Sequence, residues 1–243
     1  MILPNVLLLV TIMSLVWFLK GDLLGYRRIK RLPDTASRQK TYRLWIAKAA
    51  IAFVLPAVVG LALLGRFDAV VTVPPEFDDL RIRLPSFAGD SRAFVLGMIG
   101  GGALAGLVIG AFLATRRTSR MLKPFGNAGS LLPRNRPEIA HAAAMAIAAG
   151  ISEELAFRLF LPLLLVLVSS SATVAFGIAL ALFGAMHRYQ GWAGVIATTI
   201  VGGLMTAVYL MTGSLWLAMA LHALIDLNSL ALRPALTGAW RAA

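Results

Sequence analysis

Long apolar stretches alternate with short polar segments along the whole chain. A hydrocarbon core of about 30 Å takes about 20 residues of α-helix, and the apolar stretches approach or exceed this length. They are residues 3–19, 46–64, 93–114, 137–168, 172–187, 192–211 and 215–232. The pattern predicts an all-α, polytopic transmembrane helix bundle of about seven spans, within a range of six to eight.

Prolines and glycines predict irregularities in two of these spans. Pro56 lies inside residues 46–64 and predicts a kink there. Residues 137–168 are too long for one helix perpendicular to the membrane. We expect this stretch to begin at the interface, to tilt, or to break near Gly150 or Pro162.

The polar segments between the first spans differ in charge. Residues 20–48 and 115–136 are basic and are expected to be loops, whereas residues 66–92 hold five acids and include a short extended piece at residues 80–84. By the positive-inside rule, the basic segments are cytoplasmic, the N-terminus is outside and the C-terminus is cytoplasmic. Basic loops beside a bilayer also attract anionic lipid head groups.

Composition narrows the class of protein further. The chain is 59% hydrophobic, with a mean hydropathy of +0.81. Its net charge of +12 lies beside apolar spans, so it indicates topology and not nucleic-acid binding. The absence of cysteine excludes thiol catalysis, zinc–thiolate sites and disulfides. The first apolar stretch has no basic residues before it and no cleavage signal, which predicts a retained span.

Beyond residue 138 the chain has only three acidic side chains, and all three lie inside apolar stretches. Glu153 and Glu154 are neighbours in one stretch, and Asp226 follows His222 in another. A charge in hydrocarbon costs at least about 2.5–3.5 kcal/mol. We therefore expect these acids to be buried against partners or to face a water-filled cavity.

Helical spacing groups these acids with other polar side chains. Three pairs are spaced four residues apart and so share a helix face: Glu154 with Arg158, Phe183 with His187, and His222 with Asp226. Glu153 is turned by about 100° from Glu154 and can face another direction. If the three helices pack together, they bring Glu153, His187, His222 and Asp226 to one cavity.

Such a cavity favours hydrolysis. A carboxylate removed from bulk water, here Glu153, is a usable general base near neutral pH. A nearby histidine helps to hold a water molecule, and a second one, oriented by a carboxylate, stabilises the oxyanion of a tetrahedral intermediate. Arg158 compensates the charge of Glu154. The expected reaction is attack of an activated water on a peptide carbonyl.

The same residue types also suit a metal ion. Glu153, His187, His222 and Asp226 form a conceivable Zn²⁺ ligand set with a metal-bound water as nucleophile. The H-E-x-x-H motif is absent. Residue type alone does not separate a metal-free glutamate mechanism from a metal-assisted one, so no cofactor is assigned and Zn²⁺ stays open.

The order of these motifs resembles a known protease family. Glu153-Glu154-x-x-x-Arg158, Phe183-x-x-x-His187 and His222-x-x-x-Asp226 resemble the three motifs of the CAAX-processing and bacteriocin-processing (CPBP) intramembrane proteases, which include the Ras-converting CAAX endopeptidases. The resemblance covers about residues 137–235, a catalytic helix bundle. Residues 1–136 match only as membrane spans with basic cytoplasmic loops, and both parts are expected to form one integrated membrane domain.

The resemblance implies a role for each motif residue. Glu153 is the base, His187 works with it, and His222 with the residue four positions later forms the oxyanion side. Glu154, Arg158 and Phe183 are supporting residues. Eukaryotic members often have asparagine where this chain has Asp226, and an ionised aspartate accepts hydrogen bonds only. Asp226 is therefore better suited to orienting His222 or to binding a metal.

The resemblance also implies a setting, and two competing functions stay open. The expected protein is a multi-pass endopeptidase of the bacterial inner membrane that cleaves a membrane-associated peptide or protein. A proton-coupled transporter is one alternative, because acids and histidines also form proton relays in membranes. A non-catalytic immunity or scaffold protein that has kept the fold is the other.

Overall fold

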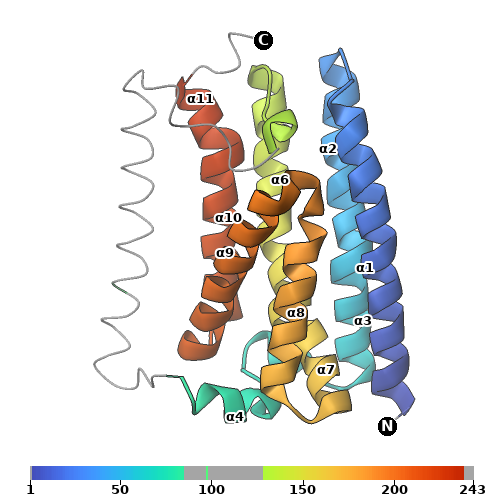
Figure 1. The fold of residues 1–243 in the computed structure, drawn as a ribbon, viewed down its shortest axis with the longest axis vertical. Coiled ribbons are helices and arrows are strands. Elements are labelled where there is room, and N and C mark those ends of the chain that lie inside the picture. Colours follow the sequence, from blue (N-terminus) through green and yellow to red (C-terminus); the bar gives the residue numbers. More distant parts are fainter. Residues whose placement is uncertain (1, 85–96, 98–127, 238–243) are drawn as a thin grey trace.

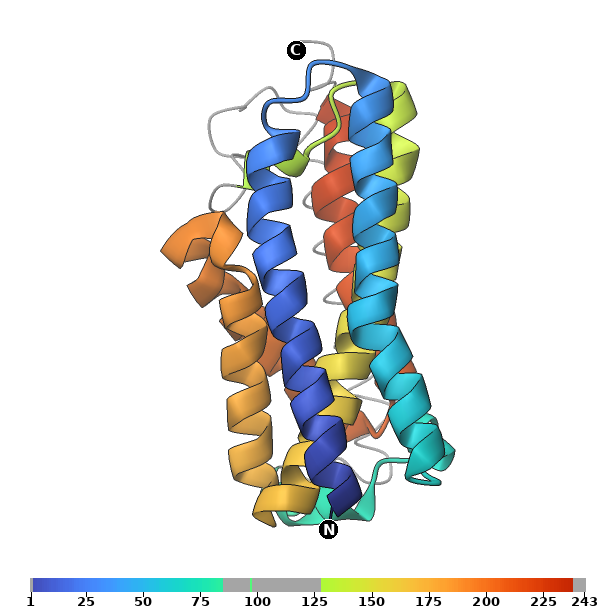
Figure 2. The ribbon, with the colours of Figure 1, turned by 90° about the vertical axis from the view of Figure 1, so that its right-hand side faces the viewer.

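The structure is a computed structural model that describes residues 2–84, 97 and 128–237. Its described part is all-α, which confirms the predicted fold class. Figures 1 and 2 show the long helices running side by side along one axis. The predicted span at residues 93–114 lies outside the described residues, apart from residue 97.

The helices follow one another in two groups. The first group is α1 (Ile2–Ile29), α2 (Thr35–Ala49), a π-helical segment (Ala50–Val54), α3 (Leu55–Leu63), 3-10 turns at Phe67–Val70 and Pro75–Phe77, and α4 (Asp78–Arg81). The second group begins with a 3-10 turn at Ala128–Leu131 and continues with α6 (Arg136–Glu154), a π-helical segment (Leu155–Phe160), α7 (Leu161–Ser169) and α8 (Ala172–Met186). It ends with a 3-10 turn (Arg188–Gln190), α9 (Gly191–Thr212), α10 (Leu215–Leu227), a π-helical segment (Asn228–Leu232) and α11 (Arg233–Thr237).

Four helices of the described part are long and apolar enough to cross a membrane. They are Ile2–Ile29, Thr35–Leu64, Arg188–Thr212 and Leu215–Leu236, and Ala172–Met186 is a shorter apolar helix. These helices are those of a multi-pass membrane protein. Their bounds agree closely with the predicted stretches at residues 172–187, 192–211 and 215–232.

Each π-helical segment ends two residues before a proline. The prolines are Pro56, Pro162 and Pro234. A prolyl nitrogen donates no hydrogen bond, and its ring clashes with the carbonyl four residues earlier. A wider turn accommodates both effects without breaking the helix. The long stretch at residues 137–168 is thus one continuous helix whose irregularity precedes Pro162, and it does not break at Gly150.

Two polar segments are mostly helical, although one was predicted to be a loop and the other to be extended. Residues 20–48 belong mostly to α1 and α2, with only a short turn between them. Lysine and arginine are good helix formers, and Asp34 caps α2 by accepting a hydrogen bond from the backbone N–H of Ser37 at 2.8 Å. The extended piece expected at residues 80–84 is also wrong, because α4 and a following turn occupy it. Asp78 and Arg81 pair there at 3.2 Å across one helical turn.

A fully buried arginine fastens the start of α6 to α2. The Nε atom of Arg38 donates to Oε2 of Glu138 at 2.9 Å, and both side chains are at most 1% exposed. Glu138 lies in the first turn of α6, where the helix dipole also favours an acid. The remaining donors of Arg38 reach the hydroxyl of Tyr42 and the backbone carbonyls of Ile29, Ser130 and Leu132.

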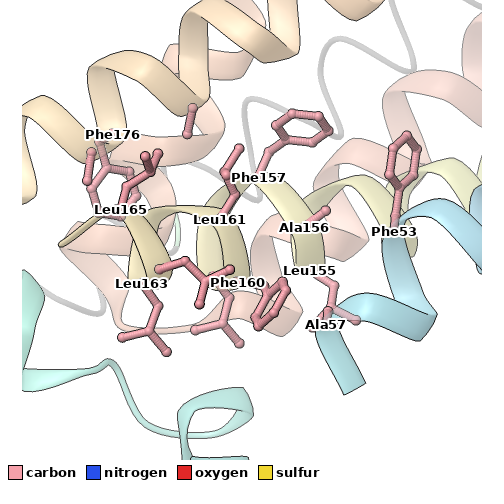
Figure 3. Packing of buried hydrophobic residues seen from close by; sticks show 14 of the residues in the cluster. Phe53, Ala57, Leu155, Ala156, Phe157, Phe160, Leu161, Leu163, Leu165 and Phe176 are labelled. Carbon is pink, nitrogen blue, oxygen red and sulfur yellow. The ribbon is translucent and has the colours of Figure 1, made fainter. Parts of the chain in front are cut away.

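The hydrophobic core lies where α6 continues through its π segment into α7. Figure 3 shows side chains of residues 155–165 packed between Phe53 and Ala57 on one side and Phe176 on the other. The Phe53 and Phe157 rings meet edge to face with centroids 5.8 Å apart. This packing holds the last turn of α6, which carries both glutamates, against the N-terminal helices.

Candidate active site

The two glutamates reach the third motif because α6 and α10 approach closely. A Cβ atom on Gly150 would lie 2.6 Å from the backbone nitrogen of Ala223, so only glycine fits without a shift. Glu153 and Glu154 follow one turn later on α6, and His222 precedes Ala223 on α10. The absence of a side chain at Gly150 therefore sets the distance between the first and third motifs.

Glu154 bridges Arg158 and His222. One carboxylate oxygen lies 3.0 Å from Nε of Arg158, as the four-residue spacing predicts. The other accepts a hydrogen bond from Nδ1 of His222 at 2.7 Å. The Arg158 and Glu154 side chains are 1% and 0% exposed. Glu154 thus accepts a hydrogen bond from His222 through one oxygen and forms an ion pair with Arg158 through the other, which makes no hydrogen bond within the described residues. It orients His222, a role that sequence reasoning had assigned to Asp226.

Glu153 faces the two histidines at a longer distance. Its Oε2 atom lies 3.9 Å from Nε2 of His187 and 4.0 Å from Nε2 of His222. The same oxygen is buried and accepts no hydrogen bond from the described protein atoms. A separation near 4 Å is too long for a direct hydrogen bond and suits a bridging water.

Local contacts fix which nitrogen of each histidine faces Glu153. His187 ends α8, and its Nδ1 atom lies 2.9 Å from the carbonyl oxygen of Phe183. Because a carbonyl only accepts, Nδ1 of His187 carries the hydrogen, just as Nδ1 of His222 does toward Glu154. In their neutral forms both rings therefore present an Nε2 acceptor to the space beside Glu153.

Asp226 and Phe183 lie against the same two histidines and Arg158. An Asp226 oxygen lies 3.7 Å from Nε2 of His222, with 30% of the aspartate side chain exposed. The Phe183 ring stacks under the Arg158 guanidinium at 4.3 Å and lies 4.9 Å from the His187 ring. All seven motif residues thus gather in one region, with Glu154, Arg158 and Phe183 forming its buried side.

The N-terminal half adds polar groups that sequence reasoning missed. Asp22 of α1 is 9% exposed, and it interacts electrostatically with Glu153 and Lys48. Tyr26 of the same helix lies with its ring 5.3 Å from that of Tyr189, which in turn lies 6.0 Å from the His187 ring. Reading residues 20–48 as a loop concealed Asp22. The sequence carried one signal for Asp22: it is a single acid that follows an apolar stretch and continues the helical spacing of that stretch.

The fit of these residues to a metal ion is poor. In the part of the chain that the structure describes, no group of three or more histidine, aspartate or glutamate side chains is arranged to hold one. The proposed set of Glu153, His187, His222 and Asp226 therefore does not form a ligand cage in this geometry.

Comparison with known proteins bears on the same stretch of chain. Residues 135–228 match the Rce1-like family profile, described as Type II CAAX prenyl endopeptidase Rce1-like. All seven motif residues fall within these bounds. Neither the curated proteins nor the solved structures contain a significant match to the chain.

Proposed function

Because residues 135–228 form an Rce1-like domain of the type II CAAX prenyl endopeptidase family, we propose that the protein is an intramembrane endopeptidase whose base is Glu153. The observation that carries the proposal is the buried Oε2 atom of Glu153. It has no hydrogen-bond partner among the described residues, and it lies 3.9 and 4.0 Å from two histidine nitrogens, which suits a bridging water. The family implies a protein or peptide substrate.

The proposed reaction begins with a water between Glu153 and the histidines. The water donates one hydrogen to the Glu153 carboxylate and the other to the Nε2 atom of His187. A lone pair of the water oxygen is then directed at a peptide carbonyl. Glu153 takes the proton as the C–O bond forms. It then returns the proton to the leaving amine as the C–N bond breaks, so that protons and electrons balance over the cycle.

His222 is proposed to stabilise the tetrahedral oxyanion. Carboxylates surround it, since Glu154 contacts its Nδ1 atom while Asp226 and Glu153 lie at 3.7 and 4.0 Å from Nε2. In the proposed step His222 is protonated, and its Nε2–H donates to the oxyanion. Asp226 then acts through His222, which agrees with its inability to donate when it is ionised.

Single substitutions test the assignment. In Glu153→Gln, His187→Ala and His222→Ala membranes, a precursor that wild-type cells process should accumulate uncleaved. Glu76→Gln and His141→Ala make the same chemical changes at exposed or partly exposed positions outside the site and should leave processing intact. Full processing in Glu153→Gln membranes would refute the base. Proton flux through the wild-type protein without cleavage would favour a transporter. An unchanged phenotype in a variant that carries all three substitutions would favour a scaffold.

The finer topology is part of the proposal. We infer about seven spans in one integrated membrane domain, with the N-terminus outside and the basic segments cytoplasmic. Support comes from the basic turn between α1 and α2 and the acidic segment at residues 66–84, which lie at opposite ends of the bundle (Figure 1). The chain has no cysteine, so single cysteines are clean probes. Lys40→Cys and Val71→Cys should be labelled from opposite sides of the membrane.

A further inference from the structure

The outer face of α1 is apolar along most of its length and becomes basic at its C-terminal end. Its exposed apolar side chains recur every three or four residues and include Val6, Leu9, Val10, Met13, Trp17 and Leu24. Arg27 and Arg28 continue the same face, since they follow Leu24 by three and four residues, and Arg31 lies in the turn just beyond the end of the helix. The opposite face of the helix, which carries Asp22, is buried in the bundle.

A groove lies at this basic end. Its volume is about 400 Å³, and it is lined by Leu24, Arg27, Arg28, Arg31 and Leu32. The three arginine side chains are exposed, and none of them forms an ion pair with a carboxylate in the described part of the chain. The lining surface is mostly apolar, and three arginine side chains without carboxylate partners in the described residues border it.

The length of α1 sets the level of this groove in a bilayer. The helix has 28 residues, and the hydrocarbon core takes about 20. An apolar face that begins at Ile2 therefore leaves the hydrocarbon after roughly residue 21, so Arg27–Arg31 reach the head groups. Leu24 lies at the boundary, where an acyl chain would pass it.

From these features we propose that the groove binds one anionic phospholipid of the surrounding bilayer. The lipid phosphate accepts charge-assisted hydrogen bonds from Arg27, Arg28 and Arg31, whose planar guanidinium groups suit bidentate contact with phosphate oxygens. The acyl chains lie over Leu24 and continue along the apolar face of α1. A zwitterionic lipid carries a compensating cation and gains less from three arginines.

Lipid retention by the purified protein tests this site directly. Native mass spectrometry of the full-length protein, after exchange into detergent with equal phosphatidylglycerol and phosphatidylcholine, should show one retained phosphatidylglycerol. Each basic residue beside an anionic head group contributes roughly fivefold in affinity. The Arg27→Gln/Arg31→Gln variant should therefore bind phosphatidylglycerol about 30-fold more weakly.

A matched variant separates the groove from general positive charge. Lys40→Gln/Arg43→Gln also removes two exposed cations at the same end of the bundle and should keep affinity within about twofold of the parent. Equal retention of the two lipids, or equal losses in both double variants, would overturn the proposal. Displacement of the lipid by millimolar inorganic phosphate would also overturn it, because it would show a phosphate site without a role for acyl chains.

A second measurement does not depend on removing charge. The Leu24→Trp variant places an indole at the expected acyl contact on an exposed position. Phosphatidylglycerol brominated in its acyl chains should quench this added fluorescence more strongly than brominated phosphatidylcholine does. Equal quenching by both would contradict the proposal even if the arginine variants proved unstable. Neither readout depends on proteolysis, so a negative result for the lipid site would leave the proposed function untouched, and the reverse also holds.

Discussion

Neutralising Glu154 should reduce both stability and activity, for two separable reasons. Glu154→Gln leaves the Arg158 guanidinium, which is 1% exposed, without its carboxylate. Breaking a buried ion pair on one side costs about 3–5 kcal/mol. Arg158 keeps its stacking on Phe183 and its 3.3 Å bond to the Gly202 carbonyl, so we expect a loss near the lower limit, about 3 kcal/mol.

Removing both charges should restore stability but not activity. Replacing a buried ion pair by uncharged residues of similar volume is often neutral. The Glu154→Gln/Arg158→Met variant should therefore unfold in lipid bicelles within about 1 kcal/mol of the parent protein. His222 nevertheless loses the carboxylate that holds its Nδ1 atom at 2.7 Å. A hydrogen bond to a charged partner is worth about 1.5–3 kcal/mol, so cleavage should stay reduced by about 10–100-fold.

These Glu154 and Arg158 substitutions form a double-mutant cycle, and a more exposed ion pair at the other end of the bundle provides a comparison for its coupling free energy. Arg66 and Glu76 also form a bidentate pair, but their side chains are 22% and 24% exposed. The same cycle there should give a coupling free energy of no more than about 1 kcal/mol. Recovery of full cleavage together with stability in the Glu154→Gln/Arg158→Met protein would show that Glu154 is only a counter-ion, and the positioning argument would be refuted.

Three further predictions follow from contacts outside the proposed base. Gly150→Ala should lower the free energy of unfolding by about 1–3 kcal/mol and slow cleavage, because its Cβ would meet the α10 backbone, whereas Gly177→Ala meets nothing within 4 Å and should be neutral or stabilising in the same unfolding assay. Arg38→Met should cost about 3–5 kcal/mol by stranding the buried Glu138 carboxylate, and adding Glu138→Gln should recover most of that loss in thermal unfolding. The hydrogen bond from Arg66 lowers the pKa of Glu76, so this pair should stabilise the protein above the unfolded pKa of about 4.3 and lose that effect as pH falls through the folded pKa. Glu76→Gln should remove this pH dependence from unfolding curves, and persistence of the pH dependence would contradict the assignment.

The sequence predicts those parts of the site that depend on spacing within one helix. The Glu154–Arg158 pair follows from a separation of four residues, and so does the common face of His222 and Asp226. The hydrogen bond from His222 to Glu154 joins two residues that are 68 positions apart in sequence and lie on different helices. It depends on how closely α6 and α10 approach, and the small residue that permits this approach, Gly150, has no special meaning until its neighbour is known.

Charge density misled the interpretation of the N-terminal half. A run of lysines and arginines between apolar stretches is typical of a cytoplasmic loop, but these residues also favour helices. The turn between α1 and α2 is therefore short, and the helices extend beyond the apolar stretches. Asp22 consequently faces the bundle interior near Glu153, and Arg38 is fully buried although its neighbours Gln39 and Lys40 are not.

The match to the Rce1-like profile spans residues 135–228, yet α6 is held by contacts from outside that range. Its first turn is tied to α2 by the Arg38–Glu138 pair. Its continuation beyond the glutamates is held by the Phe53 ring, which packs against Phe157. The direction of the Glu153 carboxylate therefore depends on both halves of the chain, because a helix fixed at only one end could rotate by the fraction of a turn that separates Glu153 from Glu154. This dependence explains in physical terms why the two halves are expected to act as one domain although only the second carries the motifs.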